Sequence, residues 1–565
     1  MRHGARSGGP TVKGVDAVAK ILKQEGVEYL FAYPNNSLID SAAALGIRPI
    51  IARGEKTLIN IADGYCRATN GTKPTVLCVQ EGPGIENAFG GMAQAFADSI
   101  PVLIIPGGPE PARHFSPTNF DPIPPFQHIT KWSARISTPG RVTEMLRRAF
   151  THLRAGPPGP VLLELPRDVA GAEIDEKDLA YSPVKSLRSA GDPSDVADVA
   201  ARALAAARPM ILAGHGVLWA QAWDELRELA ELLQAPVMTT MAAKSVFPEN
   251  HPLSAGTGGL TLAGGAAHSL LRTDLVIALG TGLSKSGFVT PIPPGRAIVQ
   301  ITNNERDIGK GYAVDAAILG DVKLVARQLI DELRRGGARG AAKPEVAAGL
   351  REAHEEYLKE WIPRLTSEDT PINPYRVVWD INRTVDRATT VITHDSGNPR
   401  DQTLTFYEAV TPRGYLGWGK STQLGTGLGL VMGAKLAFPE KLCINIMGDL
   451  AFGTAGMEIE TAVRERIPTL TVILNNSRMG GYGHHMPRAS ERYQSNMLSG
   501  NYTRVAEGLG AWAQRVEKPG DVVPALRRAI EQTRQGRVAL LEVITAEDPV
   551  YPRSADLLKA TAAAY

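Results

Sequence analysis

An acidic residue and a carboxamide each follow an apolar run in the C-terminal third of the chain. Asp449 follows Leu442 to Met447, and Asn476 follows Thr471 to Leu474. The helix-like segment from Gly456 to Arg466 lies between the two runs, so they predict parallel strands joined by a crossover helix, with their carboxyl ends side by side. Ligands bind at that edge of open α/β sheets. Mg²⁺ takes a carboxylate, few other protein oxygens and ligand phosphates. The pattern therefore predicts a site for a magnesium diphosphate, and its alternative is an ordinary βαβ unit with a turn Asp and two turn Asn.

The stretch from Gly448-Asp449-Leu450 to Asn475-Asn476 resembles the thiamine-diphosphate signature, which runs from Gly-Asp-Gly to Asn-Asn. The rest of the chain resembles the acetolactate synthase-like branch of that superfamily nearly from end to end. The resemblance implies that the metal is bound by Asp449, the Asn476 side chain and the Arg478 carbonyl. It also implies that the cofactor is contacted by Gly448, Leu450, Ala451, Met479 and Gly480. Leu450 departs from the family, which usually has Gly there, so a close backbone approach to the diphosphate must tolerate a side chain.

A second match lies in the N-terminal third. Arg53-Gly54-Glu55, a helix-like run ending in Gly64-Tyr65-Cys66-Arg67, and Gln80 to Gly84 with Asn87 resemble the family's Arg-His-Glu, Gly-Tyr-Ala-Arg and Ser-Gly-Pro-Gly motifs. The match implies that Glu55 is the catalytic glutamate and that Glu55, Pro34, Gly82 and Asn87 contact the cofactor.

The chemistry of thiamine explains why a glutamate is needed. A carboxyl group bonded to the aminopyrimidine ring nitrogen favours the imino tautomer, whose exocyclic nitrogen can remove the C2 proton. A dry pocket raises the pKa of a carboxyl group and lets it share a proton in this way. The alternative for Glu55 is a first-turn residue of a helix that begins near Thr57.

A third match is the Gly-rich segment from Gly419 to Ala434. Its glycines lack the Gly-x-Gly-x-x-Gly spacing of a dinucleotide loop, and no strand leads directly into it. It resembles the family segment that supports the bent thiamine, and Leu424 falls where relatives carry the apolar wedge between the two rings. A core leucine is the alternative. Earlier, Gly397 and Asn398 match a strand-end loop that touches the diphosphate, although this chain has Pro399 where relatives often have His.

Three clusters should face the substrate, and each departs from the family. Tyr33-Pro34-Asn35-Asn36-Ser37 replaces Tyr-Pro-Gly-Gly, Asn119-Phe120-Asp121 replaces Phe-Gln-Glu, and the loop after the metal motif carries paired histidines. Each cluster has a plain alternative, a turn or a solvated surface residue. The candidate substrate residues are Asn35, Asn36, Ser37, Phe120, Asp121, Tyr482, His484 and His485.

Composition is typical of a globular enzyme. The chain has 565 residues and a net charge of +2, so no basic footprint indicates nucleic acid as a partner. No apolar run is long enough to span a membrane. The first ten residues lack the apolar core of a secretory signal, and three scattered cysteines argue against a disulfide framework, so we expect a cytosolic protein.

Strand-like runs alternate with helix-like runs in three blocks, which predicts an α/β fold of three doubly wound parallel-sheet domains. The predicted strands are 29–31, 75–79, 102–105 and 161–165 in the first block, 210–213, 237–239, 275–279 and 298–301 in the second, and 390–393, 442–447, 470–474 and 539–543 in the third. The expected domains are 1–185, which binds the thiamine pyrimidine, 186–345, which is central, and 346–565, which binds the diphosphate and Mg²⁺. A linker is expected over 335–344, where Gly and Ala gather. Residues 551–565 are expected to form a short helix or lid, or an unstructured tail. The family places its cofactor between two subunits, which implies a homodimer at least, with a tetramer open.

The central block departs from flavin-binding relatives. Thr281 to Lys285 stands where they have an Arg-rich and Asp-rich turn, and Asn303-Asn304 stands where they have acidic residues, so bound FAD is doubtful. We predict a lyase or carboligase, dependent on thiamine diphosphate and Mg²⁺, that acts on a small 2-oxo acid or 2-hydroxy carbonyl compound. The alternatives are a 2-hydroxyacyl-CoA lyase or oxalyl-CoA decarboxylase, or a non-catalytic thiamine-binding homologue.

Overall fold

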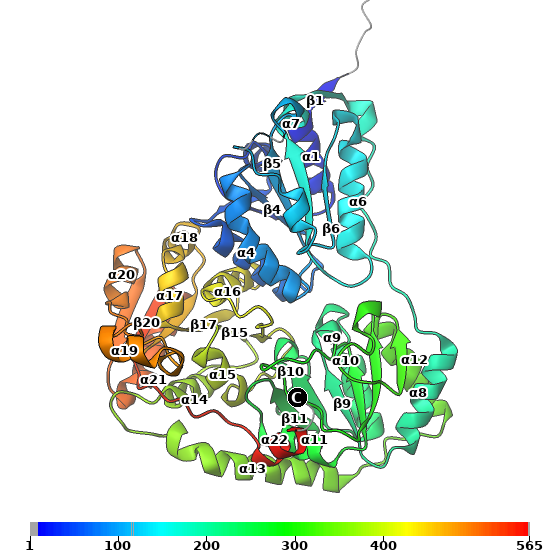
Figure 1. The fold of residues 1–565 in the computed structure, drawn as a ribbon, viewed down its shortest axis with the longest axis vertical. Helices are drawn as coiled ribbons and strands as arrows, with labels where there is room; N and C mark the ends of the chain where they lie inside the picture. Colours follow the sequence, from blue (N-terminus) through cyan, green and yellow to red (C-terminus); the bar gives the residue numbers. More distant parts are fainter. Residues whose placement is uncertain (1–9, 115, 117, 563–565) are drawn as a thin grey trace, which may run out of the picture. The chain divides into compact units, whose positions relative to one another are not determined.

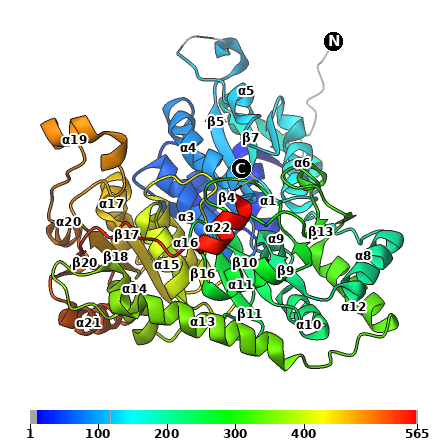
Figure 2. The ribbon, with the colours of Figure 1, turned by 60° about the horizontal axis from the view of Figure 1, so that its bottom comes forward.

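The computed structural model describes residues 10–114, 116 and 118–562 (Figures 1 and 2). Contacts between Cα atoms divide them into two compact units. The first unit holds the chain up to Leu187 together with Met432–Ala437, and the second holds Arg188–Val431 and Phe438 onward. Among the described residues, no helix combines the length and the apolar character needed to cross a bilayer.

The first unit is built on a six-stranded sheet in the order β3-β2-β4-β5-β7-β6. All its neighbouring strands pair in parallel. A separate antiparallel pair joins β1 to β8. The strands are β1 (Thr11–Lys13), β2 (Tyr29–Ala32), β3 (Arg48–Ile51), β4 (Thr75–Val79), β5 (Val102–Gly108), β6 (Trp132–Arg135), β7 (Val161–Pro166) and β8 (Glu173–Asp175). The helices are α1 (Gly14–Gln24), α2 (Leu38–Ala44), α3 (Glu55–Ala68), α4 (Pro83–Ala97), α5 (Ile123–Phe126), α6 (Val142–Arg154) and α7 (Arg167–Gly171).

The second unit contains two six-stranded parallel sheets. The central sheet has the order β11-β10-β9-β12-β13-β14, formed by β9 (Pro209–Ala213), β10 (Val237–Thr240), β11 (Ser254–Gly258), β12 (Leu275–Leu279), β13 (Ala297–Thr302) and β14 (Ala316–Leu319). Its helices are α8 (Pro193–Ala205), α9 (His215–Trp219), α10 (Trp223–Leu233), α11 (Gly264–Arg272) and α12 (Val322–Arg335). Residues 336–343 form no helix or strand, which agrees with the predicted linker.

The third sheet has the order β16-β15-β17-β18-β20-β19. It consists of β15 (Thr390–His394), β16 (Tyr415–Leu416), β17 (Leu442–Gly448), β18 (Leu470–Asn475), β19 (Trp512–Val516) and β20 (Ala539–Ile544). The helices from the linker onward are α13 (Pro344–Leu365), α14 (Pro374–Thr384), α15 (Asn398–Phe406), α16 (Thr426–Ala437), α17 (Asp449–Ala455), α18 (Glu458–Arg464), α19 (Pro487–Tyr493), α20 (Tyr502–Gly508), α21 (Val522–Arg534) and α22 (Ala555–Thr561). In both views α13 runs along the central and third sheets (Figures 1 and 2).

Each sheet is buried between helices, as the alternating pattern predicts. The strands with continuous apolar sequence, such as β4, β9 and β12, are buried at every residue. The α/β fold with three parallel-sheet domains is confirmed. The domain limits at 185/186 and 345/346 stay predictions.

The crossover between β17 and β18 differs from the expected single helix. Helix α17 begins at Asp449 itself, directly after the strand, and α18 follows after Gly456 and Met457. The predicted helix-like segment began only at Gly456. The apolar residues of the strand continue into those of α17 with Asp449 as the polar residue between them, so no change in the pattern marks the start of α17.

The C-terminal segment runs from the third sheet to the central block. Tyr375 Oη donates to the Val550 carbonyl, and Leu262 N donates to the Pro552 carbonyl. Leu557 of α22 then packs in the central hydrophobic core. The described part of the expected terminal helix therefore forms and is anchored by packing, and its role as a lid stays a prediction.

Candidate active site

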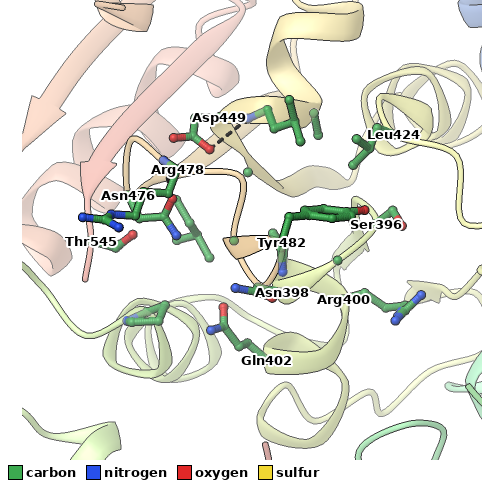
Figure 3. Close-up of a pocket in the computed structure, with 18 of the residues that line it drawn as sticks. Ser396, Asn398, Arg400, Gln402, Leu424, Asp449, Asn476, Arg478, Tyr482 and Thr545 are labelled. Atoms are coloured by element: carbon green, nitrogen blue, oxygen red, sulfur yellow. Dashed lines mark hydrogen bonds between the residues drawn. The ribbon is translucent and has the colours of Figure 1, made fainter. Parts of the chain in front are cut away.

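A pocket of ≈ 180 Å³ opens at the carboxyl edge of the third sheet (Figure 3). Strands β15 and β17 are neighbours in this sheet. The chain continues from β15 to β16 on one side and from β17 to β18 on the other, so it leaves the two strands in opposite directions. Such a switch point leaves a crevice beyond the strand ends, where open α/β sheets bind ligands. The predicted residues that line the pocket are Gly397, Asn398, Leu424, Gly448, Asp449, Leu450, Ala451, Asn476, Arg478, Gly480 and Tyr482.

Asp449 is the buried carboxylate of this pocket, with 3% of its surface exposed. Its Oδ1 accepts from Leu450 N at 2.9 Å, whereas its buried Oδ2 has no hydrogen-bond partner. Burial raises the pKa of Asp449 above its usual value, and the backbone N–H groups of Leu450, Ser477 and Arg478 partly offset that rise. A buried carboxylate oxygen without a partner is costly, so this atom is suited to a cation.

The second predicted ligand lies on the turn that follows β18. Asn476 Oδ1 accepts from Arg478 N at 3.0 Å, and Ser477 between them has a φ of +55°. Asn475, by contrast, is tied to the fold, because its Nδ2 donates to Glu542 Oε1 at 2.8 Å. No described group of three or more His, Cys, Asp or Glu side chains could hold a metal. One carboxylate with amide and main-chain oxygens is the donor set that Mg²⁺ uses beside ligand phosphates, so these residues fit the ion.

Two glycines let the backbone approach closely here. Gly397 precedes α15 with a φ of +83°, which a side chain rarely tolerates. A Cβ on Gly480 would lie 2.8 Å from Asn398 Nδ2. Asn398 itself accepts a hydrogen bond from Tyr551 Oη of the C-terminal segment. The loop after β15 and the loop after β18 therefore meet at Asn398, and Tyr551 orients the Asn398 side chain.

The Gly-rich segment is held by a buried aspartate. Asp395 accepts from Gly425 N through Oδ1 and from Gly427 N through Oδ2, both at 2.9 Å. These bonds fix the start of α16 beside the loop that follows β15. Leu424, the predicted wedge, directly precedes this anchored stretch and lines the pocket.

In the first unit, Glu55 is the first residue of α3 and only 7% exposed. Asn87 of α4 donates to its Oε2 across 3.5 Å. The predicted catalytic and cofactor residues are thus neighbours, and Gly82 caps α4 with a φ of +63°. The alternative, a first-turn position, also holds for Glu55, because the two readings are compatible.

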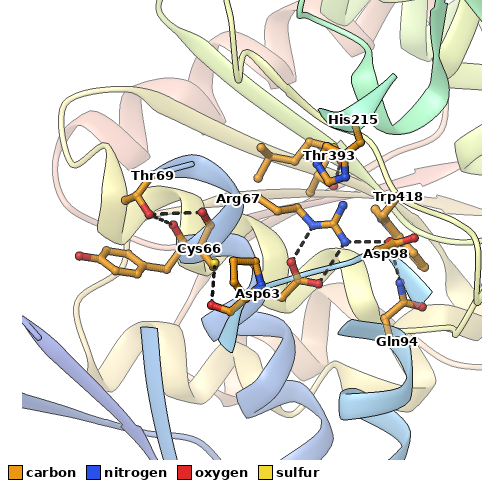
Figure 4. Close-up of polar contacts among 12 residues, drawn as sticks. Asp63, Cys66, Arg67, Thr69, Gln94, Asp98, His215, Thr393 and Trp418 are labelled. Atoms are coloured by element: carbon orange, nitrogen blue, oxygen red, sulfur yellow. Dashed lines mark hydrogen bonds and ion pairs between the residues drawn. The ribbon is translucent and has the colours of Figure 1, made fainter. Parts of the chain in front are cut away.

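A buried ionic network fastens α3 to α4 (Figure 4). Arg67 Nε lies 2.6 Å from Asp63 Oδ1, and Arg67 Nη2 lies 2.7 Å from Asp98 Oδ2. Gln94 Nε2 donates to the same Asp98 oxygen at 2.9 Å. Because the network spans both helices, it helps to keep Glu55 and Asn87 in register.

The substrate candidates of the first unit are engaged in local structure. Asn35 has a φ of +72°, and Asn36 Nδ2 donates to the Val79 carbonyl at 2.9 Å. Asp121 Oδ1 accepts from Ile123 N at 3.1 Å and from Arg135 Nη2 at 3.0 Å. Pro34 and Ser37 are exposed, and Phe120 is half-buried.

The loop after the metal motif is only partly in the pocket. Tyr482 lines the pocket with half of its surface exposed, and Gly481 N donates to Glu547 Oε1 at 3.0 Å. His484 and His485 are exposed, with ring centroids 3.8 Å apart. Met479 N donates to the Asn496 carbonyl, and its side chain does not line the pocket.

Several lining residues were not predicted. Thr545 follows β20, so its place at a strand end could have indicated it. Arg400 and Gln402 lie on α15 just beyond the predicted Gly397-Asn398 pair. Phe288 comes from the central block, and no signal in the sequence places it here. The unpredicted polar lining residues are Ser396, Arg400, Gln402, Thr422 and Thr545.

Comparisons with known proteins agree with this geometry. Three family models match: the N-terminal TPP binding domain of thiamine pyrophosphate enzymes over residues 12–120, the central domain over 196–329 and the C-terminal TPP binding domain over 395–543. The chain is 32% identical to a probable acetolactate synthase large subunit of Methanocaldococcus jannaschii, with 92% of this chain and 90% of that protein covered. It is 29% identical to the glyoxylate carboligase of Escherichia coli O157:H7, with 94% and 93% covered.

A further relative is the sulfoacetaldehyde acetyltransferase of Alcaligenes xylosoxydans xylosoxydans, which is 29% identical with 96% of this chain and 94% of that protein covered. The predicted superfamily and its acetolactate synthase-like branch are confirmed. The family models and the full-length relatives together show that the chain belongs to the thiamine pyrophosphate enzymes, and it is a thiamine-diphosphate-dependent enzyme.

Proposed function

We propose that the protein uses thiamine diphosphate and Mg²⁺ to break and form a carbon–carbon bond next to the carbonyl of a small 2-oxo acid, as an acetolactate synthase-like carboligase. The metal assignment rests on Asp449 Oδ2, which is buried at the start of α17 and has no hydrogen-bond partner. Asn476 and the Arg478 carbonyl would complete the protein's share of the ligands, and phosphate and water oxygens would supply the rest.

Thiamine diphosphate, when bound, supplies an electron-accepting ring that lets a bond next to a carbonyl break. The protein's part is to hold, orient and exclude water. Glu55 is buried, and it would hold a proton in a hydrogen bond to the cofactor's pyrimidine nitrogen. Leu424 would support the bent cofactor from the Gly-rich segment. Gly397 and Gly480 would let backbone N–H groups approach the phosphates.

The reaction class is supported by relatives of three names. The chain aligns along nearly its whole length with proteins named for acetolactate synthesis, for glyoxylate carboligation and for acetyl transfer from sulfoacetaldehyde. Two of these names denote the joining of small 2-oxo acids, which favours pyruvate first and glyoxylate second. We also propose a homodimer as the minimal active unit, with a tetramer as the alternative, because the family resemblance places the cofactor between subunits.

The test is release of carbon dioxide from pyruvate, and separately from glyoxylate, by the full-length protein with thiamine diphosphate and Mg²⁺. Glu55→Gln is the matched variant, because it keeps the size of the side chain and removes only its acid function. Acetolactate is assayed in the same pyruvate reactions.

Release that depends on Glu55, with acetolactate formed, is the expected result. Release from glyoxylate alone would move the substrate to the second candidate. If neither acid gave carbon dioxide, the 2-oxo acid assignment would be wrong, and 2-hydroxyacyl-CoA and oxalyl-CoA would be the next substrates to assay.

A further inference from the structure

Arg400 lines the pocket, and none of the roles proposed above uses its side chain. It is the third residue of α15 and only 2% exposed. Figure 3 shows it on the side of Ser396 and Leu424, across the pocket from Asp449 and Asn476. The diphosphate and its metal belong to the Asp449 side, so Arg400 stands toward the end where Leu424 would support the reacting ring.

The hydrogen bonds of Arg400 leave one of its nitrogens unused. Nε and Nη2 donate to the two carboxylate oxygens of Asp401, each at 2.8 Å. Nη1 is buried and has no hydrogen-bond partner. A buried guanidinium N–H without an acceptor is unfavourable, so this position calls for an oxygen atom. The bidentate pair with Asp401 fixes the direction of that vacant donor.

Further charged groups lie around this pair. Asp401 is buried beside Arg400, and Arg553 of the C-terminal segment lies near enough to help lower the pKa of Asp401 against the rise that burial causes. Around Tyr551, the carboxylates of Asp401 and Glu547 balance the guanidinium groups of Arg400 and Arg553. The unused N–H of Arg400 still favours a charged acceptor over a neutral one, because charge-assisted hydrogen bonds are the stronger.

A partly exposed aromatic ring covers the guanidinium. Phe288 of the central block packs over Arg400 with 4.7 Å between the guanidinium carbon and the ring centroid, and it is 40% exposed. A Cβ on Gly419 would lie 3.6 Å from Nη1 and 2.7 Å from Met241 Cε, so Met241 fills the space beside this glycine. A rotation of the exposed Phe288 would open Nη1 to the pocket without disturbing the Asp401 pair.

We propose that Arg400 binds the carboxylate of the acceptor 2-oxo acid, the molecule that receives the new carbon–carbon bond, with Phe288 as the ring that moves aside. The proposal rests on the carboligase function proposed above. The donor is a poorer fit, because its carboxylate leaves as carbon dioxide, and a cation that held it would stabilise the ground state more than the transition state. The acceptor keeps its carboxylate, so binding it firmly costs the reaction nothing.

Product partition is the first test. Wild type and Arg400→Gln are supplied with pyruvate alone, or with pyruvate and acetaldehyde, which is an acceptor without a carboxylate. Arg400→Gln should lower acetolactate formation ~10-fold, the loss of one charge-assisted hydrogen bond, and leave acetoin formation from acetaldehyde within ~2-fold. An equal fall of both products would place Arg400 at the donor or the fold and overturn the proposal.

Direct binding keeps the proposal testable if pyruvate is not a substrate. Oxamate, an unreactive isostere of pyruvate, and its neutral amide oxamide are titrated into the protein with thiamine diphosphate and Mg²⁺ present. Oxamate should bind Arg400→Gln ~10-fold more weakly, and oxamide should bind both proteins alike. Equal binding of oxamate to both proteins, or no binding to wild type, would overturn the Arg400 site. Carbon dioxide release judges the proposed function separately.

Two further variants separate binding from folding and from the cofactor. The double variant Arg400→Gln with Asp401→Asn also removes the buried Asp401 carboxylate, which Arg400→Gln alone would leave without its cation. The double variant should therefore fold and still bind oxamate weakly. Phe288→Ala leaves the ion pair intact and should bind oxamate ~3-fold more tightly, because the cation–π contact no longer has to be broken. If Arg400→Gln instead weakened thiamine diphosphate by the same factor as oxamate, the Arg400 ligand would be a phosphate and the proposal would be wrong.

Discussion

Asp449 shows how a single residue can be unfavourable for the fold and suited to a ligand. Its carboxylate is buried, one oxygen has a backbone donor, and the other oxygen has none. Burial without a bound cation would favour the protonated form of Asp449, whereas a bound cation would favour the charged form. Two measurable consequences follow from this competition, one for stability and one for pH dependence.

Asp449→Asn should separate metal binding from stability. The variant keeps the hydrogen bond from Leu450 N and removes the buried charge, so its melting temperature without ligands should not fall below that of wild type. It should lose at least ~100-fold in Mg²⁺ affinity, because even partners behind a metal ligand contribute 10–100-fold. Differential scanning fluorimetry with and without thiamine diphosphate and Mg²⁺ measures both. Asp331→Asn, an exposed carboxylate on α12, is the matched control. A normal ligand-induced shift in Asp449→Asn would rule out the proposed metal site.

The raised pKa of Asp449 fixes the sign of a pH effect. Its folded pKa lies above the usual 3.8, so the native state holds the proton more tightly than the unfolded chain does. This contribution to stability is complete below 3.8 and is lost as pH rises through the folded pKa. Mg²⁺ should therefore stabilise wild type more at pH 7 than at pH 4, and it should not do so for Asp449→Asn. Urea unfolding at both pH values measures the difference. A Mg²⁺ effect that grew toward low pH would contradict it.

The position of a side chain could be predicted where it follows from a place at a strand end. Asp449, Asn476 and Asn398 belong to this class, and all three line one pocket. Asp121 shows the limit, because its carboxylate bonds to Arg135, fourteen residues away in sequence and on the next strand. Arg400 shows it too, since its vacant nitrogen results from the pairing of its other two with Asp401.

At the scale of elements, strand prediction succeeded inside each sheet and failed at its borders. All twelve predicted strands form, and they are the four inner strands of each six-stranded sheet. The border strands β3, β6, β11, β14, β16 and β19 were all missed. Inner strands are buried on both faces and read as apolar runs. Border strands are not: β6 is half-buried at every residue, and β16 has two residues.

The Arg67 network should be essential to the α3–α4 pair. Arg67→Met would leave Asp63 and Asp98 buried without their cation, and breaking a buried pair on one side typically costs ~3–5 kcal/mol. We expect a lower free energy of unfolding. We also expect slower pyruvate decarboxylation, because the same helix carries Glu55. Urea unfolding measures the first, and pyruvate decarboxylation the second. Arg148→Met is the matched control, because Arg148 pairs with Glu144 at an exposed position. Equal destabilisation by both substitutions would show that the network adds nothing.

At the scale of the whole molecule, the first and third sheets share one topology. When the strands are numbered within their own block, the first and third sheets both have the order 2-1-3-4-6-5, whereas the central sheet has the order 3-2-1-4-5-6. Two blocks of the same topology carry the predicted pyrimidine and diphosphate residues. In the first block these residues follow strands one, two and three, with Glu55 after strand two, and in the third block they follow strands one to four, with Asn476 after strand four. The shared order explains why the two halves of one cofactor could be held by equivalent edges of two sheets. It could not be predicted from the sequence, because strand order depends on the border strands.

Complementation between variants tests where the two halves meet. Suppose that Glu55 and Asp449 of one site come from different subunits of a symmetric dimer. Mixing Glu55→Gln and Asp449→Asn chains by co-expression would then give half of the dimers as hybrids, each with one intact site, so about a quarter of wild-type activity should return. If both residues came from one chain, every site would keep one substitution and no activity would return. Each variant alone, and the two purified variants mixed without co-expression, are the controls. Sedimentation analysis of the co-expressed sample establishes that hybrids form, so that zero recovery in a dimeric sample would place the site within one subunit.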